Sequence, residues 1–230
     1  MNDLLIHRSE LARMIDFVDL RVTATRDDII SLVADACDYG VHSIGSPYCF
    51  HPIVVDELKK RGMYGKIDVL GGAGFADGNW PTQVKLASIA CCLENGCTEI
   101  DLTSNVCYIK SGMWDEYEEE IRRVRTLTRG HILKVIIHTP LLEEAEIRTA
   151  CEVLLRNDAD FVKTDTGRAG SPTTVEHVRT IKETIGDRMK IKAAGGIRDI
   201  ETICEMIDLG VTRFGMSRNS AIKVLDLLEN

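Results

Sequence analysis

The chain has 230 residues, 44% hydrophobic and 28% charged, which is enough to bury a substantial core and argues against a disordered or fibrous protein. Its formal net charge of −8 and its lack of a Lys/Arg block argue against a nucleic-acid partner, because such binding depends on clustered basic charge. The N-terminus lacks the apolar core of a leader, and no stretch has the roughly 18 apolar residues that span a bilayer, so we expect no membrane association.

The cysteines and histidines show no metal-ligand pattern. Eight cysteines are scattered along the chain, no two of them at Cys-X-X-Cys spacing, and most lie in apolar segments where a free thiol behaves as a small hydrophobic side chain. Five of the histidines, His7, His42, His51, His131 and His177, likewise lack ligand spacing. We therefore expect a reduced, cytoplasmic protein with neither a metal nor a cofactor.

Short apolar runs alternate with longer segments of helical period along the chain. The apolar runs predict strands at 14–20, 42–46, 67–72, 99–104, 132–139, 161–165, 189–195 and 212–217. The segments between them predict helices at 25–40, 52–62, 81–96, 111–130, 141–158, 173–186, 199–210 and 219–230. Eight strand–helix units without a linker predict one (β/α)8 TIM barrel over residues 1–230, with a doubly wound open sheet as the alternative.

Five charged residues interrupt the predicted strands: Asp16, Asp101, Lys134, Lys163 and Lys192. Lys163 and Lys192 lie on successive predicted strands, which are adjacent in such a barrel. Because side chains along a strand point alternately to its two faces, both lysines can face the interior, where their amines could approach one another. Active sites of such barrels lie at the carboxyl ends of the strands. A lone lysine at a strand end commonly extends to solvent, but two adjacent lysines with an interior carboxylate favour a catalytic site.

Two ammonium groups in a partly dry pocket repel one another, and burial disfavours the charged form, so one lysine of the pair should be neutral near neutral pH. A neutral lysine amine attacks a carbonyl carbon to form a Schiff base, which then serves as an electron sink. Asp101 is placed to pair with Lys192 and to transfer protons. This combination predicts a class I aldolase.

Glycine-rich turns follow three of the predicted strands, in the segments 166–170, 194–199 and 213–220. Their backbone N–H groups and the helices that begin after them are suited to bind phosphate. Arg168, Arg198 and Arg218 add positive charge. A phosphate-binding barrel isomerase or synthase without a Schiff base, and a catalytically silent sugar-phosphate sensor, stay open as alternatives.

Several segments together resemble the deoxyribose-phosphate aldolases. "FVKTDTG" (161–167) is similar to the Schiff-base segment of that family, and "IKAAGGIRD" (191–199) is similar to its phosphate-loop segment. "EIDLTSNVCYIKSGMWDEYEEEI", "LKVIIHT" and "TQVKLASIACCLENG" match further family patterns in the expected order. The resemblance covers the chain from about residue 15 to its end. It implies a (β/α)8 barrel that converts 2-deoxyribose 5-phosphate to glyceraldehyde 3-phosphate and acetaldehyde, without a metal, and often as a homo-oligomer.

The resemblance also implies roles for individual residues. Lys163 would form the Schiff base, Lys192 would favour its neutral amine, Asp101 would transfer protons, and Asp16 and Lys134 would complete the polar network. The residues expected to bind the phosphorylated sugar are Asp165, Thr166, Gly167, Arg168, Gly195, Gly196, Arg198, Gly215, Ser217 and Arg218.

The chain departs from the family pattern at 16–21, 44–52, 71–80, His138 and Asp165. These positions surround the expected substrate carbonyl and hydroxyls. Gly72 and Ala73 stand where larger family residues are expected and should open space, and Asp165 is expected to accept a hydrogen bond from a substrate hydroxyl. The same mechanism acting on another sugar or ketose phosphate is therefore an alternative.

Overall fold

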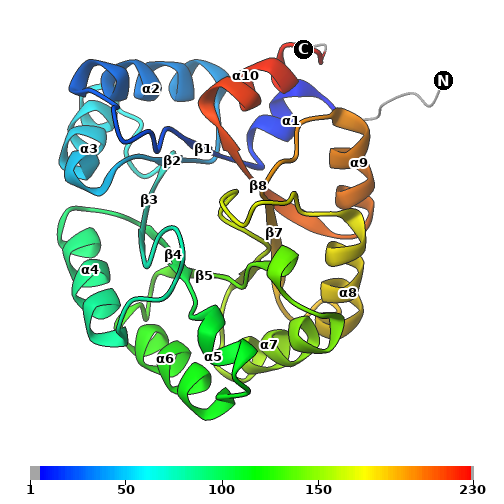
Figure 1. The fold of residues 1–230 in the computed structure, drawn as a ribbon. Helices are drawn as coiled ribbons and strands as arrows, with labels where there is room; N and C mark the ends of the chain where they lie inside the picture. The colour runs from blue at the N-terminus through cyan, green and yellow to red at the C-terminus, as the bar shows by residue number, and fades with distance from the viewer. Residues whose placement is uncertain (1–5, 229–230) are drawn as a thin grey trace.

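The structure is a computed structural model that describes residues 6–228. Its strands form a closed parallel barrel in the order β1 to β8, with β1 paired to β8 (Figure 1). The strands are β1 (Ile15–Val18), β2 (Ser43–Gly45), β3 (Asp68–Ala73), β4 (Glu99–Thr103), β5 (Ile132–Ile136), β6 (Phe161–Lys163), β7 (Lys190–Ala194) and β8 (Val211–Ser217). The (β/α)8 prediction is confirmed, and closure excludes the open doubly wound sheet.

Helices surround the barrel on all sides (Figure 1). They are α1 (Arg8–Ala12), α2 (Arg26–Tyr39), α3 (His51–Lys60), α4 (Thr82–Glu94), α5 (Val106–Lys110), α6 (Trp114–Leu127), α7 (Glu144–Arg156), α8 (Val175–Ile185), α9 (Ile200–Asp208) and α10 (Arg218–Leu225), with 3-10 turns η1 (Tyr48–Phe50) and η2 (Thr139–Leu141). No helix within residues 6–228 is long and apolar enough to cross a bilayer.

Two short helices were not expected from the sequence pattern. Helix α1 buries Leu11 and Ala12 completely and packs beside α10. Helix α5 begins where the Asn105 side chain accepts a hydrogen bond from the backbone N–H of Cys107 at 3.1 Å. Each helix spans 5 residues, too few for helical periodicity to show in the sequence.

Several strands end earlier than predicted. β5 ends at Ile136 rather than residue 139, because His138 adopts left-handed backbone geometry with φ of 57°. β6 ends at Lys163 rather than at residue 165. The polar residues beyond these ends therefore belong to loops at the carboxyl mouth of the barrel.

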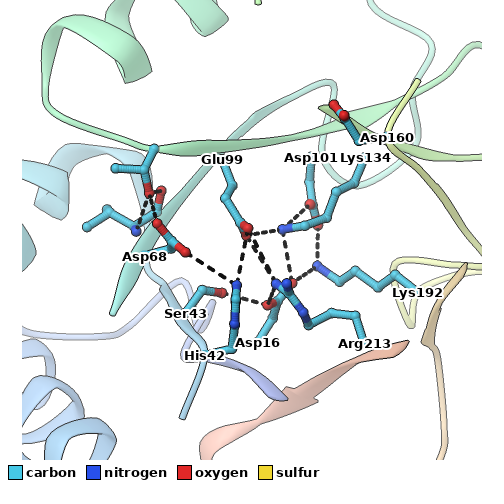
Figure 2. A network of polar contacts seen from close by, with 12 residues as sticks. Asp16, His42, Ser43, Asp68, Glu99, Asp101, Lys134, Asp160, Lys192 and Arg213 are labelled. Atoms are coloured by element: carbon cyan, nitrogen blue, oxygen red, sulfur yellow. Dashed lines mark hydrogen bonds and ion pairs between the residues drawn. The ribbon is translucent and has the colours of Figure 1, made fainter. Parts of the chain in front are cut away.

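Side chains alternate between the barrel interior and the layer under the helices. In β4, Ile100 and Leu102 are fully buried in the apolar core, whereas Glu99 and Asp101 point into the barrel (Figure 2). Parallel pairing sets Asp101 beside Lys134. The strand register thus places charges, rather than aliphatic side chains, at the centre of the barrel.

Candidate active site

The barrel interior holds a network of charged side chains from six strands, most of which Figure 2 shows. Every member is less than one-tenth exposed. The anions are Asp16, Glu99 and Asp101, and the cations are Lys134, Lys163, Lys192 and Arg213. Because buried charges are stable only when they are paired, their ion pairs fix the geometry of the site.

Lys163 and Lys192 meet at one oxygen of Asp101. The Nζ of Lys163 lies 2.7 Å from Asp101 Oδ2, and the Nζ of Lys192 lies 2.8 Å from the same atom. The two lysines are also register partners on β6 and β7. Gly215 leaves room for them, since a Cβ there would lie 3.3 Å from Lys192 Cε and 3.9 Å from Lys163 Cε. The approach of the two amines agrees with the strand-period prediction.

Asp16 is at the centre of a second layer of the network. It pairs with Lys192, with Lys134 at 3.2 Å and with Arg213 at 2.8 Å, and accepts a hydrogen bond from Ser43 at 2.7 Å. All its side-chain surface is buried, so Asp16 supports the cavity floor from beneath.

Two members of the network, Glu99 and Arg213, were not among the residues predicted from the sequence. Glu99 pairs with Lys134 and lies 3.3 Å from the guanidinium of Arg213. A signal was available for Glu99, because it precedes Asp101 by two positions and therefore shares its face of β4. It stands at the start of the predicted strand, where an exposed charge is common.

The network shifts the pKa values of its members in opposite directions. Burial lowers the pKa of Lys192 to about 8, with further lowering by Lys163 and Lys134, although Asp101 and Asp16 oppose this. For Asp101, burial would raise the pKa, but Lys163 and Lys192 hold it below the ordinary value. Asp16 behaves similarly under the charges of Lys134 and Lys192. Both carboxylates are therefore ionised at neutral pH, and Lys192 is the amine prepared to lose a proton.

A cavity of about 650 Å³ opens above these amines, and Asp101, Lys163 and Lys192 line its floor. Nine of the ten predicted substrate-binding residues line its wall and rim: Thr166, Gly167, Arg168, Gly195, Gly196, Arg198, Gly215, Ser217 and Arg218. Asp16 and Lys134 are not among the lining residues, because they lie beneath the floor. Reactive amines and cationic loops therefore share one cavity.

Residues 8–217 match the DeoC/LacD family aldolases. The chain belongs to this family. It is 37% identical over 217 residues to the deoxyribose-phosphate aldolase of Mannheimia succiniciproducens, covering 94% of this chain and 95% of that protein. Among solved structures, "QR15, an aldolase" superposes with a TM-score of 0.86 at 31% identity, covering 99% of this chain and 96% of the other. The tetrameric deoxyribose phosphate aldolase from Aeropyrum pernix superposes with a TM-score of 0.84 at 27% identity, covering 95% of this chain and 91% of the other.

Family membership makes the protein an aldolase, which is a carbon–carbon lyase. It disfavours the isomerase, synthase and sensor alternatives.

Asp165 and His138, two of the departures from the family pattern, are partners. His138 Nδ1 lies 2.6 Å from Asp165 Oδ1, and both side chains are buried. Asp165 Oδ2 accepts the backbone N–H of Gly167 at 2.7 Å. Asp165 is fully buried and does not line the cavity, which corrects the expectation that it accepts from a substrate hydroxyl. It holds the turn that carries Arg168, and it occupies the N–H of Gly167 that was expected to face phosphate.

Two further predicted phosphate residues have protein partners in this aldolase. The Arg218 guanidinium donates to Asp35 at 2.7 Å and to Ser31 at 2.8 Å, both on α2. The Ser217 side chain accepts from the backbone N–H of Ser220 and so caps α10. Arg168 and Arg198, by contrast, line the cavity with no such ion pair among residues 6–228.

The side chain of Tyr48, in the turn η1 after β2, occupies the space that was expected at Gly72. A Cβ on Gly72 would lie 3.0 Å from the Tyr48 hydroxyl and 2.6 Å from the backbone oxygen of Asp101. Tyr48 lines the cavity, and burial raises its pKa, so the phenol stays protonated at neutral pH. The departures at 44–52 and 71–80 thus place a hydroxyl group beside Asp101, a feature that the sequence pattern did not reveal.

The departure at 16–21 supplies another polar pair at the mouth. Asp19 and Arg21 both line the cavity, and the Arg21 side chain binds both carboxylate oxygens of Asp19, at 2.9 Å and 2.6 Å. Arg21 also lies 3.2 Å from Asp28 at the start of α2. This pair makes the β1 side of the cavity polar.

Proposed function

We propose that this aldolase cleaves 2-deoxyribose 5-phosphate to glyceraldehyde 3-phosphate and acetaldehyde through a Schiff base on Lys163. The observation that carries the proposal is the single Asp101 oxygen that contacts both Lys163 and Lys192 at the cavity floor. The relative from Mannheimia succiniciproducens bears the name of this activity.

The first step requires a neutral amine. Lys192, whose pKa is about 8, can lose its proton near neutral pH. Lys163 can then transfer a proton to Lys192 through Asp101 Oδ2, which leaves the Lys163 amine neutral. The neutral Lys163 amine then attacks the substrate aldehyde carbon, and the adduct loses water to give a protonated imine. Lys163 is better placed for this attack than Lys192, because Lys192 is fully buried and Lys163 is 8% exposed.

The imine then accepts the electrons of the carbon–carbon bond that breaks. A base removes the proton from the C3 hydroxyl, the C2–C3 bond breaks, and its electron pair forms an enamine while glyceraldehyde 3-phosphate leaves. Protonation of the enamine carbon and addition of water release acetaldehyde and the Lys163 amine. Asp101 and Lys192, acting directly or through water, are the groups within reach for these proton transfers.

The rim cations are suited to hold the phosphate during this sequence. Arg168 and Arg198 bring charge from the loops after β6 and β7, and the turn at Gly195 and Gly196 lets backbone approach an anion. A phosphate held there leaves the aldehyde end directed toward the floor.

A hydroxylated ketose phosphate is a second candidate substrate, favoured by Tyr48. Its protonated hydroxyl lies close to Gly72 and to the Asp101 backbone, where it could bind a hydroxyl that the acetaldehyde unit lacks. This candidate shares the imine mechanism and differs only in the donor half of the substrate.

Borohydride trapping with a substrate panel tests both candidates. The enzyme is incubated with deoxyribose 5-phosphate, other aldose phosphates or ketose phosphates, reduced, and examined by peptide mass spectrometry. We expect an adduct on Lys163 that disappears in Lys163→Ala, while Lys190→Ala, an exposed lysine of β7, retains it. Turnover by Lys163→Ala, or no adduct with any carbonyl substrate, would exclude the imine mechanism.

We also propose that the enzyme is a cytoplasmic homo-oligomer. The Aeropyrum pernix relative is tetrameric, and the eight cysteines of this chain are free thiols, as in a reducing compartment. Light scattering coupled to size exclusion measures the assembly, and a monomer at micromolar concentration would refute it.

A further inference from the structure

Three metal-ligating side chains meet outside the barrel, behind β3. His51 is the first residue of α3, Cys92 lies in α4, and Cys97 lies just before β4. One ligand atom from each falls within 4.8 Å of the others, and His51 Nδ1 lies 3.2 Å from Cys97 Sγ. None of the three is more than 2% exposed. The cluster shares no residue with the ionic network of the active site.

The strand beside the cluster is shaped to admit both thiols. A Cβ on Gly71 would lie 2.7 Å from Cys92 Cβ and 3.0 Å from Cys97 Sγ, so any larger residue would displace them. The backbone N–H of Cys97 donates to the carbonyl of Cys92 at 3.0 Å, which fixes one cysteine relative to the other. Close approach of two thiols and an imidazole is thus built into three separate segments.

We propose that His51, Cys92 and Cys97 bind one Zn²⁺ ion. Zinc favours thiolate sulfur and imidazole nitrogen in tetrahedral sites, with separations of about 3.6 Å between neighbouring ligand atoms from the usual bond lengths. The observed 3.2 Å between Nδ1 and Sγ needs only a small expansion.

Charge balance and coordination also suit zinc. Binding releases one proton from each thiol, and two thiolates neutralise the ion, so the filled site places no net charge in this dry layer. Water or the carbonyl of Gly72, which accepts from Cys92 Sγ at 3.5 Å, would complete the coordination as the fourth ligand.

The site has a structural consequence for the cavity. Zinc would join α3, the end of α4 and the entrance to β4, all through ligands on short side chains. The His51 ring lies 5.4 Å from the ring of Tyr48, which lines the cavity. Holding His51 therefore holds the segment that carries Tyr48.

Metal analysis of the reduced, full-length protein tests the site. Protein produced with added zinc and then desalted should contain about one zinc per chain by mass spectrometry of the metal. Cys92→Ser and Cys97→Ser should lose it. Two matched controls should keep it: Cys91→Ser, an exposed neighbour on α4, and Cys151→Ser, a buried thiol of α7.

Measurements on the wild-type protein test the zinc site even if the serine variants fold poorly. Removal of zinc by a chelator should lower the melting temperature, and added zinc should restore it. Co²⁺ in place of zinc should give the visible absorption of thiolate-bound cobalt. Wild-type protein that gains neither zinc nor the cobalt spectrum after unfolding and refolding with metal would overturn the proposal and leave a packed thiol cluster.

Discussion

Replacing Lys192 by methionine tests how the barrel prepares its nucleophile. With a pKa of about 8, the amine of Lys192 is neutral in about one-tenth of wild-type molecules at pH 7. The variant removes the amine to which Lys163 can pass its proton through Asp101, and leaves only the ammonium groups of Lys163 and Lys134 facing that carboxylate. The rate of imine formation at pH 7 should therefore fall by about 10²-fold or more, the scale typical of losing a positioned proton-transfer group.

The pH profile distinguishes this effect from damage to the fold. Wild-type kcat/KM should rise about fivefold from pH 7 to pH 8 and level off above it. In Lys192→Met the rise should move to higher pH, so that activity partly recovers near pH 10. Lys190→Met, at the exposed start of β7, is the matched control and should follow the wild type.

Removing a buried ammonium leaves its carboxylate partners unpaired and should lower the free energy of unfolding by about 3–5 kcal/mol. Circular dichroism must therefore show that the variant is folded. A folded Lys192→Met enzyme with more than a tenth of wild-type activity at pH 7, or with a pH profile whose rise keeps the wild-type midpoint near pH 8, would refute the reasoning.

Three further predictions concern the carboxylates and Tyr48. Asp101→Asn keeps the side-chain shape but removes the charge shared by two amines, and should lower kcat by about 10²- to 10⁴-fold in steady-state assays; nearly normal turnover would exclude its role in proton transfer. Tyr48→Phe should raise KM for a hydroxylated ketose phosphate about tenfold and leave deoxyribose 5-phosphate unaffected, whereas equal effects would count against the donor-pocket role. The pKa values of Asp16 and Asp101 are below the ordinary value of 3.8, so the stability they contribute is complete above that value and is lost as the pH falls below it. Urea midpoints should decline from pH 5 to pH 3, less steeply in Asp16→Asn, and a constant midpoint would contradict this.

Alternation within strands was the most informative part of the sequence. It predicted that Lys163 and Lys192 share the barrel interior with Asp101, because a strand has only two faces and the opposite one is apolar. The glycine turns after β6, β7 and β8 also lie at the cavity, since all parallel strands end at the same mouth.

Contacts between distant loops could not be predicted in this way. The sequence predicts Asp165 as a substrate ligand because it departs from the family pattern beside the expected Schiff-base lysine, but its partner His138 is 27 positions away and the pair is buried in the protein. Tyr48, in η1 after β2, meets Gly72 of β3 from 24 positions away in the sequence, so no local pattern could indicate this contact. The cysteine spacing likewise concealed a cluster whose third member, His51, comes from another helix.

The arrangement of interior charge divides the barrel into two complementary halves. The three anions of the interior network, Asp16, Glu99 and Asp101, come from β1 and β4, whereas its four cations, Lys134, Lys163, Lys192 and Arg213, come from β5 to β8. Neither half can neutralise its own interior, and each would bury uncompensated charge if it folded alone. The reactive amines therefore attract the first half of the chain to the second, so the residues proposed for catalysis also make closure of the barrel cooperative.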